Sequence, residues 1–165
     1  MERINRILEN EEYRSYVRRI EEAERERRFC LHNMGHFLDV CRLALLEYYE
    51  AGQKGEVPDL RIDWIYGAGL LHDIGRFMEY ESGIPHEKAS AGLAPGILRD
   101  CGFSEKEINC ITEAIENHRN KEVSDRMSLS GFLYRGDKKS RPCFACKAER
   151  ECDWSSQKKN LKLLR

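Results

Sequence analysis

Residues 60–75, LRIDWIYGAGLLHDIG, form an apolar stretch that ends in an adjacent histidine and aspartate, His72 and Asp73. The run of apolar side chains predicts a helix from Leu60 to Ile74, which Gly75 would end in the left-handed conformation. Burying an ionised carboxylate costs several kcal/mol unless a partner or a cation neutralises it. The stretch therefore predicts a core helix with a charge at its end that needs compensation.

Helical periodicity extends in both directions from this stretch. Apolar residues recur at three- and four-residue steps through residues 1–28 and again from Phe29 to about Glu50, and a Gly- and Pro-containing break follows at 51–58. Further helices are predicted over three ranges: from Pro85, as first-turn residue, to Asp100; from the capping box of Ser104 and Glu107 to Asn117; and from Ser128 to Gly136. No alternating strand pattern interrupts them, so we expect an all-α, compact single-domain helical bundle.

Length and charge limit the classes of function. The chain has 165 residues and a net charge of -1, which fits one domain and gives no global field for nucleic acid or membranes. No apolar stretch approaches the roughly 20 residues of a membrane span, and the first residues lack a signal peptide's apolar segment, so we expect a cytoplasmic protein. We divide the chain into an N-terminal amphipathic segment (1–28), a metal-binding helical domain (29–140) and a basic, Cys-bearing tail (141–165).

Four of the five histidines fall on the inward faces of the predicted helices. A single inward histidine is usually a satisfied core residue rather than a ligand. Two aspartates share these faces, however, and buried carboxylates among imidazoles call for a cation. Four His and two Asp suit Fe, Mn, Zn, Co or Ni, and are too rich in nitrogen for a typical Mg²⁺ or Ca²⁺ site. The predicted ligands are His36, His72, Asp73, His86, His118 and Asp137.

Three of these segments resemble a known family. The sequences HFLDV (36–40), LHDIG (71–75) and LYRGDK (133–138) are similar to the H...HD...D signature of the HD-domain metal-dependent phosphohydrolases, over about residues 30–140. The resemblance implies that His36, His72, Asp73 and Asp137 hold one divalent transition metal, with Asp73 able to bridge to a second. His86 and His118 would correspond to the additional histidines of two-metal branches of the family.

The implied reaction is hydrolysis of a phosphorylated small molecule, a phosphate ester or a nucleotide, by a metal-activated water. Arg76 and Lys138 are placed to neutralise charge on phosphate, although both could be solvated charges at helix ends. The family commonly has Lys where this chain has Arg76. His32, four residues before His36, could be a ligand, a substrate-binding base or a support for a ligand. We expect Glu79 at the surface.

Two other functions use the same residues. Some HD-type proteins bind two irons with four His and two Asp and cleave a carbon bond with O₂, so a diiron oxygenase is one alternative. A non-catalytic module that binds metal and a phosphorylated ligand is the other. The complete ligand set favours an enzyme, and the oligomeric state is left open.

The tail carries Cys143, Cys146 and Cys152 in the spacing C-x2-C-x5-C. An odd number of cysteines without an export signal indicates reduced thiols or metal ligands rather than disulfides. The simplest prediction is that these small side chains pack the tail onto the body. The alternatives are redox sensing and a zinc site that one of Cys30, Cys101 or Cys110 would complete.

Overall fold

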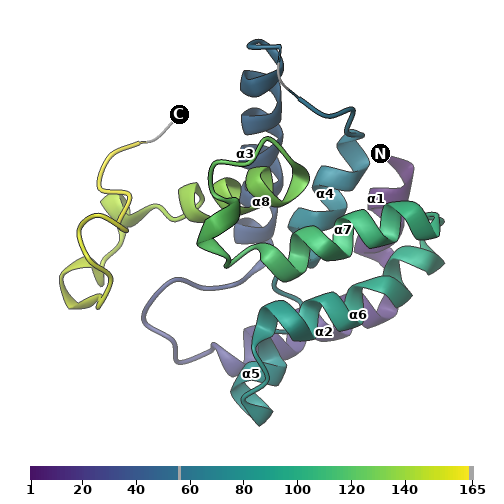
Figure 1. The fold of residues 1–165 in the computed structure, drawn as a ribbon. Helices are drawn as coiled ribbons and strands as arrows, with labels where there is room; N and C mark the ends of the chain where they lie inside the picture. The colour runs from purple at the N-terminus through teal and green to yellow at the C-terminus, as the bar shows by residue number, and fades with distance from the viewer. Residues whose placement is uncertain (56, 164–165) are drawn as a thin grey trace.

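The structure is a computed structural model that describes residues 1–55 and 57–163, and within these ranges every regular element is helical (Figure 1). The all-α prediction is therefore confirmed. No helix in the described part is long and apolar enough to cross a membrane. The α-helices are α1 (Glu2–Glu9), α2 (Glu11–Ala23), α3 (Met34–Gly52), α4 (Ile62–Leu71), α5 (Arg76–Ser82), α6 (His86–Asp100), α7 (Glu105–Asn117) and α8 (Leu129–Lys139), and the 3-10 turns are η1 (Lys121–Val123), η2 (Cys143–Ala145) and η3 (Glu149–Glu151).

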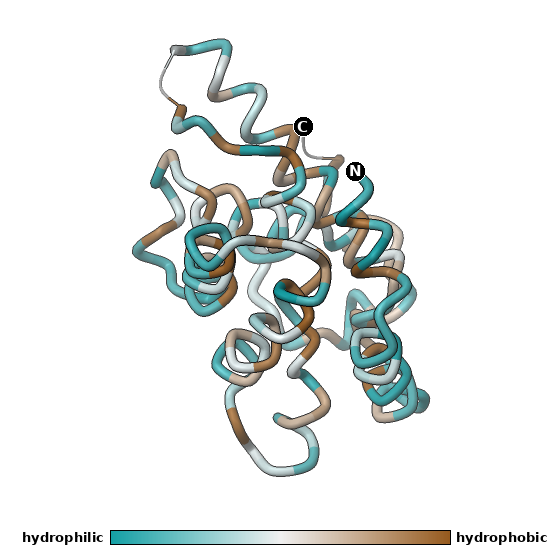
Figure 2. Tube along the Cα trace, turned by 90° about the vertical axis from the view of Figure 1, so that its right-hand side faces the viewer, coloured by the Kyte–Doolittle hydropathy of each residue, from teal (hydrophilic) through white to brown (hydrophobic). Residues whose placement is uncertain are grey.

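Helix α3 lies at the centre of the bundle and packs against α8 and α4, while α7 packs against α6 and α8. Hydrophobic and hydrophilic residues alternate along most of the helices in Figure 2, as amphipathic helices around a core require. Phe37, Ile65 and Phe132 are fully buried in that core. Burial of each such side chain contributes about 1.5–3 kcal/mol.

Gly136 lets α8 approach α3 closely. A Cβ atom at this position would lie 2.9 Å from the backbone nitrogen of Ala44 and 3.0 Å from the carbonyl oxygen of Val40. Any larger residue would push the helices apart. The close contact fixes Asp137, the next residue of α8, beside the N-terminal half of α3.

The helices of the N-terminal part differ in their bounds from those that the periodicity predicted. The predicted single helix over residues 1–28 is broken at Asn10, whose side chain accepts a hydrogen bond from the backbone of Tyr13 and caps α2. The second helix was expected from Phe29 but begins at Met34, because the Asn33 side chain accepts from the backbone of His36. Asparagine competes for backbone groups in this way at helix starts. Residues 24–33 therefore form a loop that carries His32.

The junction after α4 also differs from the prediction. Gly75 is not left-handed: its φ is -85°, and it stands before α5 rather than ending a helix that starts at Leu60. Glycine is required there because a Cβ would lie 2.4 Å from the backbone nitrogen of Ser90. The backbone N–H of Gly75 donates to Ser90 Oγ at 2.9 Å. Pro85 is the N-cap of α6 rather than a first-turn residue, which makes His86 the first residue of that helix.

Two predicted helix starts are confirmed. Ser104 and Glu107 form the capping box that opens α7, and Ser128 caps α8 by accepting from the backbone of Gly131. Glu107 also binds Arg3, whose guanidinium contacts Asp63 of α4 at 2.5 Å and Glu107 at 2.9 Å. Arg3 thereby joins α1 to α4 and α7.

Candidate metal centre

All six predicted ligands lie together in the folded chain, and all six are buried. They come from five places that are distant in sequence: the first turn of α3, the α4–α5 junction, the start of α6, the end of α7 and the last turns of α8. The close approaches at Gly75 and Gly136 help to bring these segments together. The six residues are His36, His72, Asp73, His86, His118 and Asp137.

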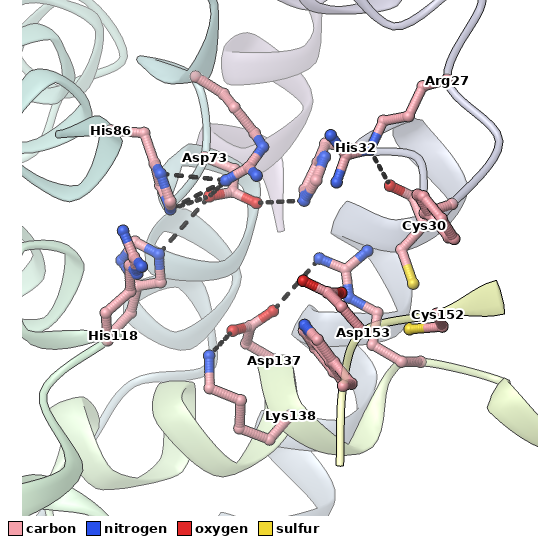
Figure 3. Close-up of a pocket in the computed structure, with 15 residues that line it drawn as sticks. Arg27, Cys30, His32, Asp73, His86, His118, Asp137, Lys138, Cys152 and Asp153 are labelled. Atoms are coloured by element: carbon pink, nitrogen blue, oxygen red, sulfur yellow. Dashed lines mark hydrogen bonds and ion pairs between the residues drawn. The ribbon is translucent and has the colours of Figure 1, made fainter. Parts of the chain in front are cut away.

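Asp73 lies between two pairs of histidines, of which His86 and His118 are drawn beside it in Figure 3. Its Oδ2 is 3.6 Å from His36 Nε2 and 3.3 Å from His72 Nε2. Its Oδ1 is 3.2 Å from His86 Nε2 and 3.5 Å from His118 Nε2. In each group of three, the candidate ligand atoms all lie within 4.8 Å of one another. One carboxylate therefore belongs to two groups that could each hold a metal ion.

Asp137 joins the first of these groups. Its Oδ1 is 3.6 Å from His36 Nε2 and 3.9 Å from His72 Nε2. Burial opposes ionisation of Asp137, but the charges of Lys138, His72 and Arg141 together outweigh it and hold the pKa of Asp137 well below its usual range. Burial also opposes ionisation of Asp73, but the neighbouring imidazoles, His72 first, keep its pKa low as well. Both aspartates are thus carboxylates, the form that binds metal.

The ring nitrogens of the histidines are arranged alike. Nδ1 of His72 lies 2.8 Å from the carbonyl oxygen of Gly69, and Nδ1 of His118 lies 2.6 Å from that of Ile115. A carbonyl can only accept, so each Nδ1 carries the proton and, in the neutral ring, Nε2 keeps its lone pair. Nδ1 of His86 meets the Glu79 carboxylate at 2.5 Å.

His36 follows the same arrangement through Ser140. The Ser140 hydroxyl donates to the Asp137 carbonyl at 2.7 Å, so its oxygen accepts from His36 Nδ1 at 3.2 Å. Burial lowers the pKa of both His36 and His86 to about 4, which keeps these imidazoles neutral near pH 7. The Nε2 atoms of His36 and His86 therefore present lone pairs toward Asp73, as metal ligands do.

Two buried atoms at the centre have no hydrogen-bond partner: His72 Nε2 and Asp73 Oδ1. Leaving buried polar atoms unpaired is unfavourable by about 1–3 kcal/mol each. A cation between Asp73 and the histidines would satisfy both atoms, and the nitrogen-rich donor set suits a transition metal. The residues present therefore fit the predicted metal.

A cavity of about 240 Å³ opens above the second histidine pair. Cationic side chains surround it, and most of its wall comes from the α2–α3 loop, α5, α8 and the tail. Arg76 lies 3.1 Å from His86 Nε2 and 4.0 Å from Asp73 Oδ1, and Lys138 lies 2.5 Å from Asp137 Oδ2. The cations that line the cavity are Arg27, Arg76, Arg119, Lys138 and Arg141.

His32 lies in the loop before α3 and also faces the centre. Its Nε2 is 3.7 Å from Asp73 Oδ2, and its Nδ1 pairs with the buried carboxylate of Glu24. The structure thus places His32 within reach of both the metal-ligand candidates and the cavity.

Three residues at the site were not found from the sequence. Glu79 was expected at the surface, but its carboxylate contacts His86 and its side chain is only 31% exposed. Arg141 donates to His36 Nε2 at 3.1 Å, and its position one helical turn after Asp137 was a usable signal. Glu24 gave no signal, because it is one of eight glutamates in an amphipathic segment.

Comparison with known proteins agrees with this site. The family model of the HD domain matches residues 30–150. A Clostridium beijerinckii protein of no assigned function is 40% identical over 163 residues, which cover 99% of each chain. No solved structure matches the chain significantly. The resemblance inferred from the histidine and aspartate motifs is confirmed: the chain belongs to the HD-domain family, whose members are typically metal-dependent phosphohydrolases.

Proposed function

We propose that the protein is a metal-dependent phosphohydrolase that acts on a phosphorylated small molecule, such as a phosphate ester or a nucleotide. The observation that carries the proposal is the position of Asp73, whose two carboxylate oxygens face separate histidine pairs beneath a cation-lined cavity. Two metal ions at these groups would activate a water and polarise a phosphoryl group.

Each ligand group has a definite composition in this proposal. His36, His72, Asp73 and Asp137 would hold the first divalent ion, and Asp73, His86 and His118 would hold the second. The second group lines the cavity, whereas His72 is completely buried. The substrate therefore enters on the side of His86 and His118.

The basic side chains bind the phosphate. The Arg76 side chain is 15% exposed, and its guanidinium is held by Tyr80 Oη at 3.1 Å and by Glu24 at 3.6 Å. Lys138 is more accessible to solvent, because 42% of its side chain is exposed. Arg76 thus supplies a fixed charge, and Lys138 an adjustable one, for phosphoryl oxygens and for charge that develops on them.

His32 contributes a hydrogen-bonding group in this proposal. Its contact with Glu24 fixes Nδ1 as the protonated nitrogen and leaves Nε2 to face the centre. Burial lowers the pKa of His32, so its Nε2 can accept a hydrogen bond from substrate or water. We assign it to substrate binding.

The oxygenase alternative uses the same donors but does not account for five cations around the cavity.

The deciding experiment starts from protein stripped of metal and reloaded separately with Mn²⁺, Co²⁺ and Fe²⁺. Release of inorganic phosphate is measured over a panel of nucleotides, sugar phosphates and a generic phosphodiester. Metal-dependent phosphate release is the expected result. O₂ consumption by the iron form, with no phosphate release from any substrate, would overturn the proposal in favour of the oxygenase.

A further inference from the structure

The tail after α8 has little regular structure and few buried side chains. From residue 141 to residue 163, the described chain forms no helix longer than the 3-10 elements η2 and η3. Its buried residues are Arg141, Cys143 and Ala148, which are too few to provide a hydrophobic core. Segments with so small a core usually need a disulfide or a metal to hold them in place.

Four cysteines meet where this tail contacts the body. Cys143, Cys146 and Cys152 line one small cavity together with Cys30, which lies in the loop between α2 and α3. Of the three candidates for a fourth cysteine, Cys30 is the one found there. Cys101 is buried in the hydrophobic core, and Cys110 packs against that core.

All four thiols are free, and the three tail thiols lie within electrostatic reach of Cys30. Burial raises the pKa of Cys30, and the three tail cysteines raise it further, whereas Arg141 lowers it. Lys159 lines the same cavity and donates to the carbonyl oxygen of Glu149 at 2.8 Å. Lys159 and Arg141 can offset negative charge that accumulates on a thiolate cluster.

We propose that Cys30, Cys143, Cys146 and Cys152 ligate a second metal centre, which fastens the tail to the loop before α3. Four cysteines from two segments around one small cavity form the ligand set of zinc and iron–sulfur centres, both of which take thiolate sulfur. This centre is separate from the His/Asp centre and shares no ligand with it.

The spread of the sulfur atoms favours a [4Fe–4S] cluster. Within the described ranges, groups of three ligand atoms within 4.8 Å of one another occur at Asp73 and its histidines, and not among these cysteines. A single tetrahedral zinc ion, with Zn–S bonds of about 2.3 Å, needs sulfurs that are closer together. A four-iron cluster places its four cysteine sulfurs at the corners of a larger tetrahedron.

The centre would also shape the cavity above the His/Asp site. Cys30 and Cys152 lie at the edge of that cavity, where Asp153 follows Cys152 (Figure 3). Trp154 lines the same wall, and Arg28 of the loop pairs with Glu151 of the tail at 2.8 Å. The centre therefore holds part of the substrate cavity in position, an assignment that rests on the proposed function.

The test measures iron, zinc and acid-labile sulfide per chain in full-length protein purified without oxygen, together with its visible absorption spectrum. The variants are Cys30→Ser and Cys143→Ser, and the matched control is Cys110→Ser. Asp73→Ala, compared in parallel, removes iron bound at the His/Asp centre. We expect about four irons and four sulfides per cluster, with a brown chromophore. The chromophore is retained in Cys110→Ser and in Asp73→Ala and is lost in Cys30→Ser and Cys143→Ser.

Wild-type protein could instead contain one zinc ion per chain that both Cys30→Ser and Cys143→Ser lack. That result would support the four-cysteine site and overturn the assignment of a [4Fe–4S] cluster. Metal that is lost in Cys143→Ser but retained in Cys30→Ser would show that Cys30 is not a ligand of this centre. Thiol alkylation of the wild-type protein, read by mass spectrometry with and without a chelator, covers the case in which a variant fails to fold. Equal labelling of the four cysteines under both conditions would overturn the centre, whatever the outcome of the phosphatase assays.

Discussion

Asp73 Oδ1 and His86 Nε2 face each other at 3.2 Å, yet Asp73 Oδ1 accepts no hydrogen bond. Because the Glu79 carboxylate holds the proton of His86 on Nδ1, both facing atoms present lone pairs. Two such atoms repel each other unless positive charge lies beside them. The Arg76 guanidinium, 3.1 Å from His86 Nε2 and 4.0 Å from Asp73 Oδ1, supplies part of that charge. A metal ion between the two atoms would also satisfy Asp73 Oδ1, which Arg76 leaves without a hydrogen bond.

Replacing Asp73 tests the shared carboxylate. We expect Asp73→Ala to retain its helical circular dichroism, to bind no metal at the centre and to fall below about one hundredth of wild-type activity, since even outer-shell changes reduce metal affinity about 10–100-fold. Elemental analysis and phosphate release measure the two effects. Asp39→Ala, an exposed aspartate of α3, is the matched control. Full activity of Asp73→Ala would be incompatible with the proposed centre.

Replacing Arg76 separates substrate binding from metal binding. Arg76→Ala should keep its metal and raise KM by about tenfold or more, because a charge-assisted hydrogen bond contributes about 1.5–3 kcal/mol. Arg76→Lys, which restores the residue type common in the family, should recover part of the loss. Steady-state kinetics with elemental analysis decide the matter, and loss of metal from Arg76→Ala would show that the guanidinium is structural.

Replacing Glu79 tests the support of the second metal. Glu79→Ala removes the carboxylate that holds Nδ1 of His86, so affinity for the second ion should fall about 10–100-fold while the first ion remains bound. Metal titration monitored by calorimetry would resolve the two events. Glu81→Ala, which removes an exposed partner of Arg19, is the control. An unchanged titration would exclude Glu79 from the site.

Acid stability should depend on Arg3. Burial opposes the ionisation of Asp63, but Arg61 and Arg3 lower its pKa, and the Arg3 hydrogen bond is the main cause that lowers the pKa of Glu107. Folded carboxyls with lowered pKa values stabilise the protein above their unfolded pKa, about 4, and lose that contribution as pH falls below it.

The corresponding variant is Arg3→Met, which removes the charge at similar length. Its free energy of unfolding should be lower than that of wild type at pH 7, and the difference should shrink between about pH 5 and pH 3. Urea unfolding at several pH values measures both quantities. A difference that does not change with pH would assign the effect to packing against Phe103, over which the Arg3 guanidinium lies 4.0 Å from the ring centroid.

The sequence predicted the parts of the site that depend on local spacing. His36 and Asp137 follow from apolar steps of four and eight residues, and the family signature supplied His72 and Asp73. The contact between Glu79 and His86 depends on how α5 meets α6, which no local pattern specifies. Spacing likewise could not choose Cys30 over Cys101, because that choice depends on the path of the loop at residues 24–33.

The histidine rings are oriented before any ion arrives. Carbonyl, hydroxyl and carboxylate groups anchor the outer nitrogen of each ring, so the protein has already given up the rotational freedom that a flexible site would lose on binding. Metal loading then resembles insertion into a rigid chelator rather than coupled folding. Such a centre selects ions by how well they accept its fixed spacing, and it would release a poorly matched ion without unfolding.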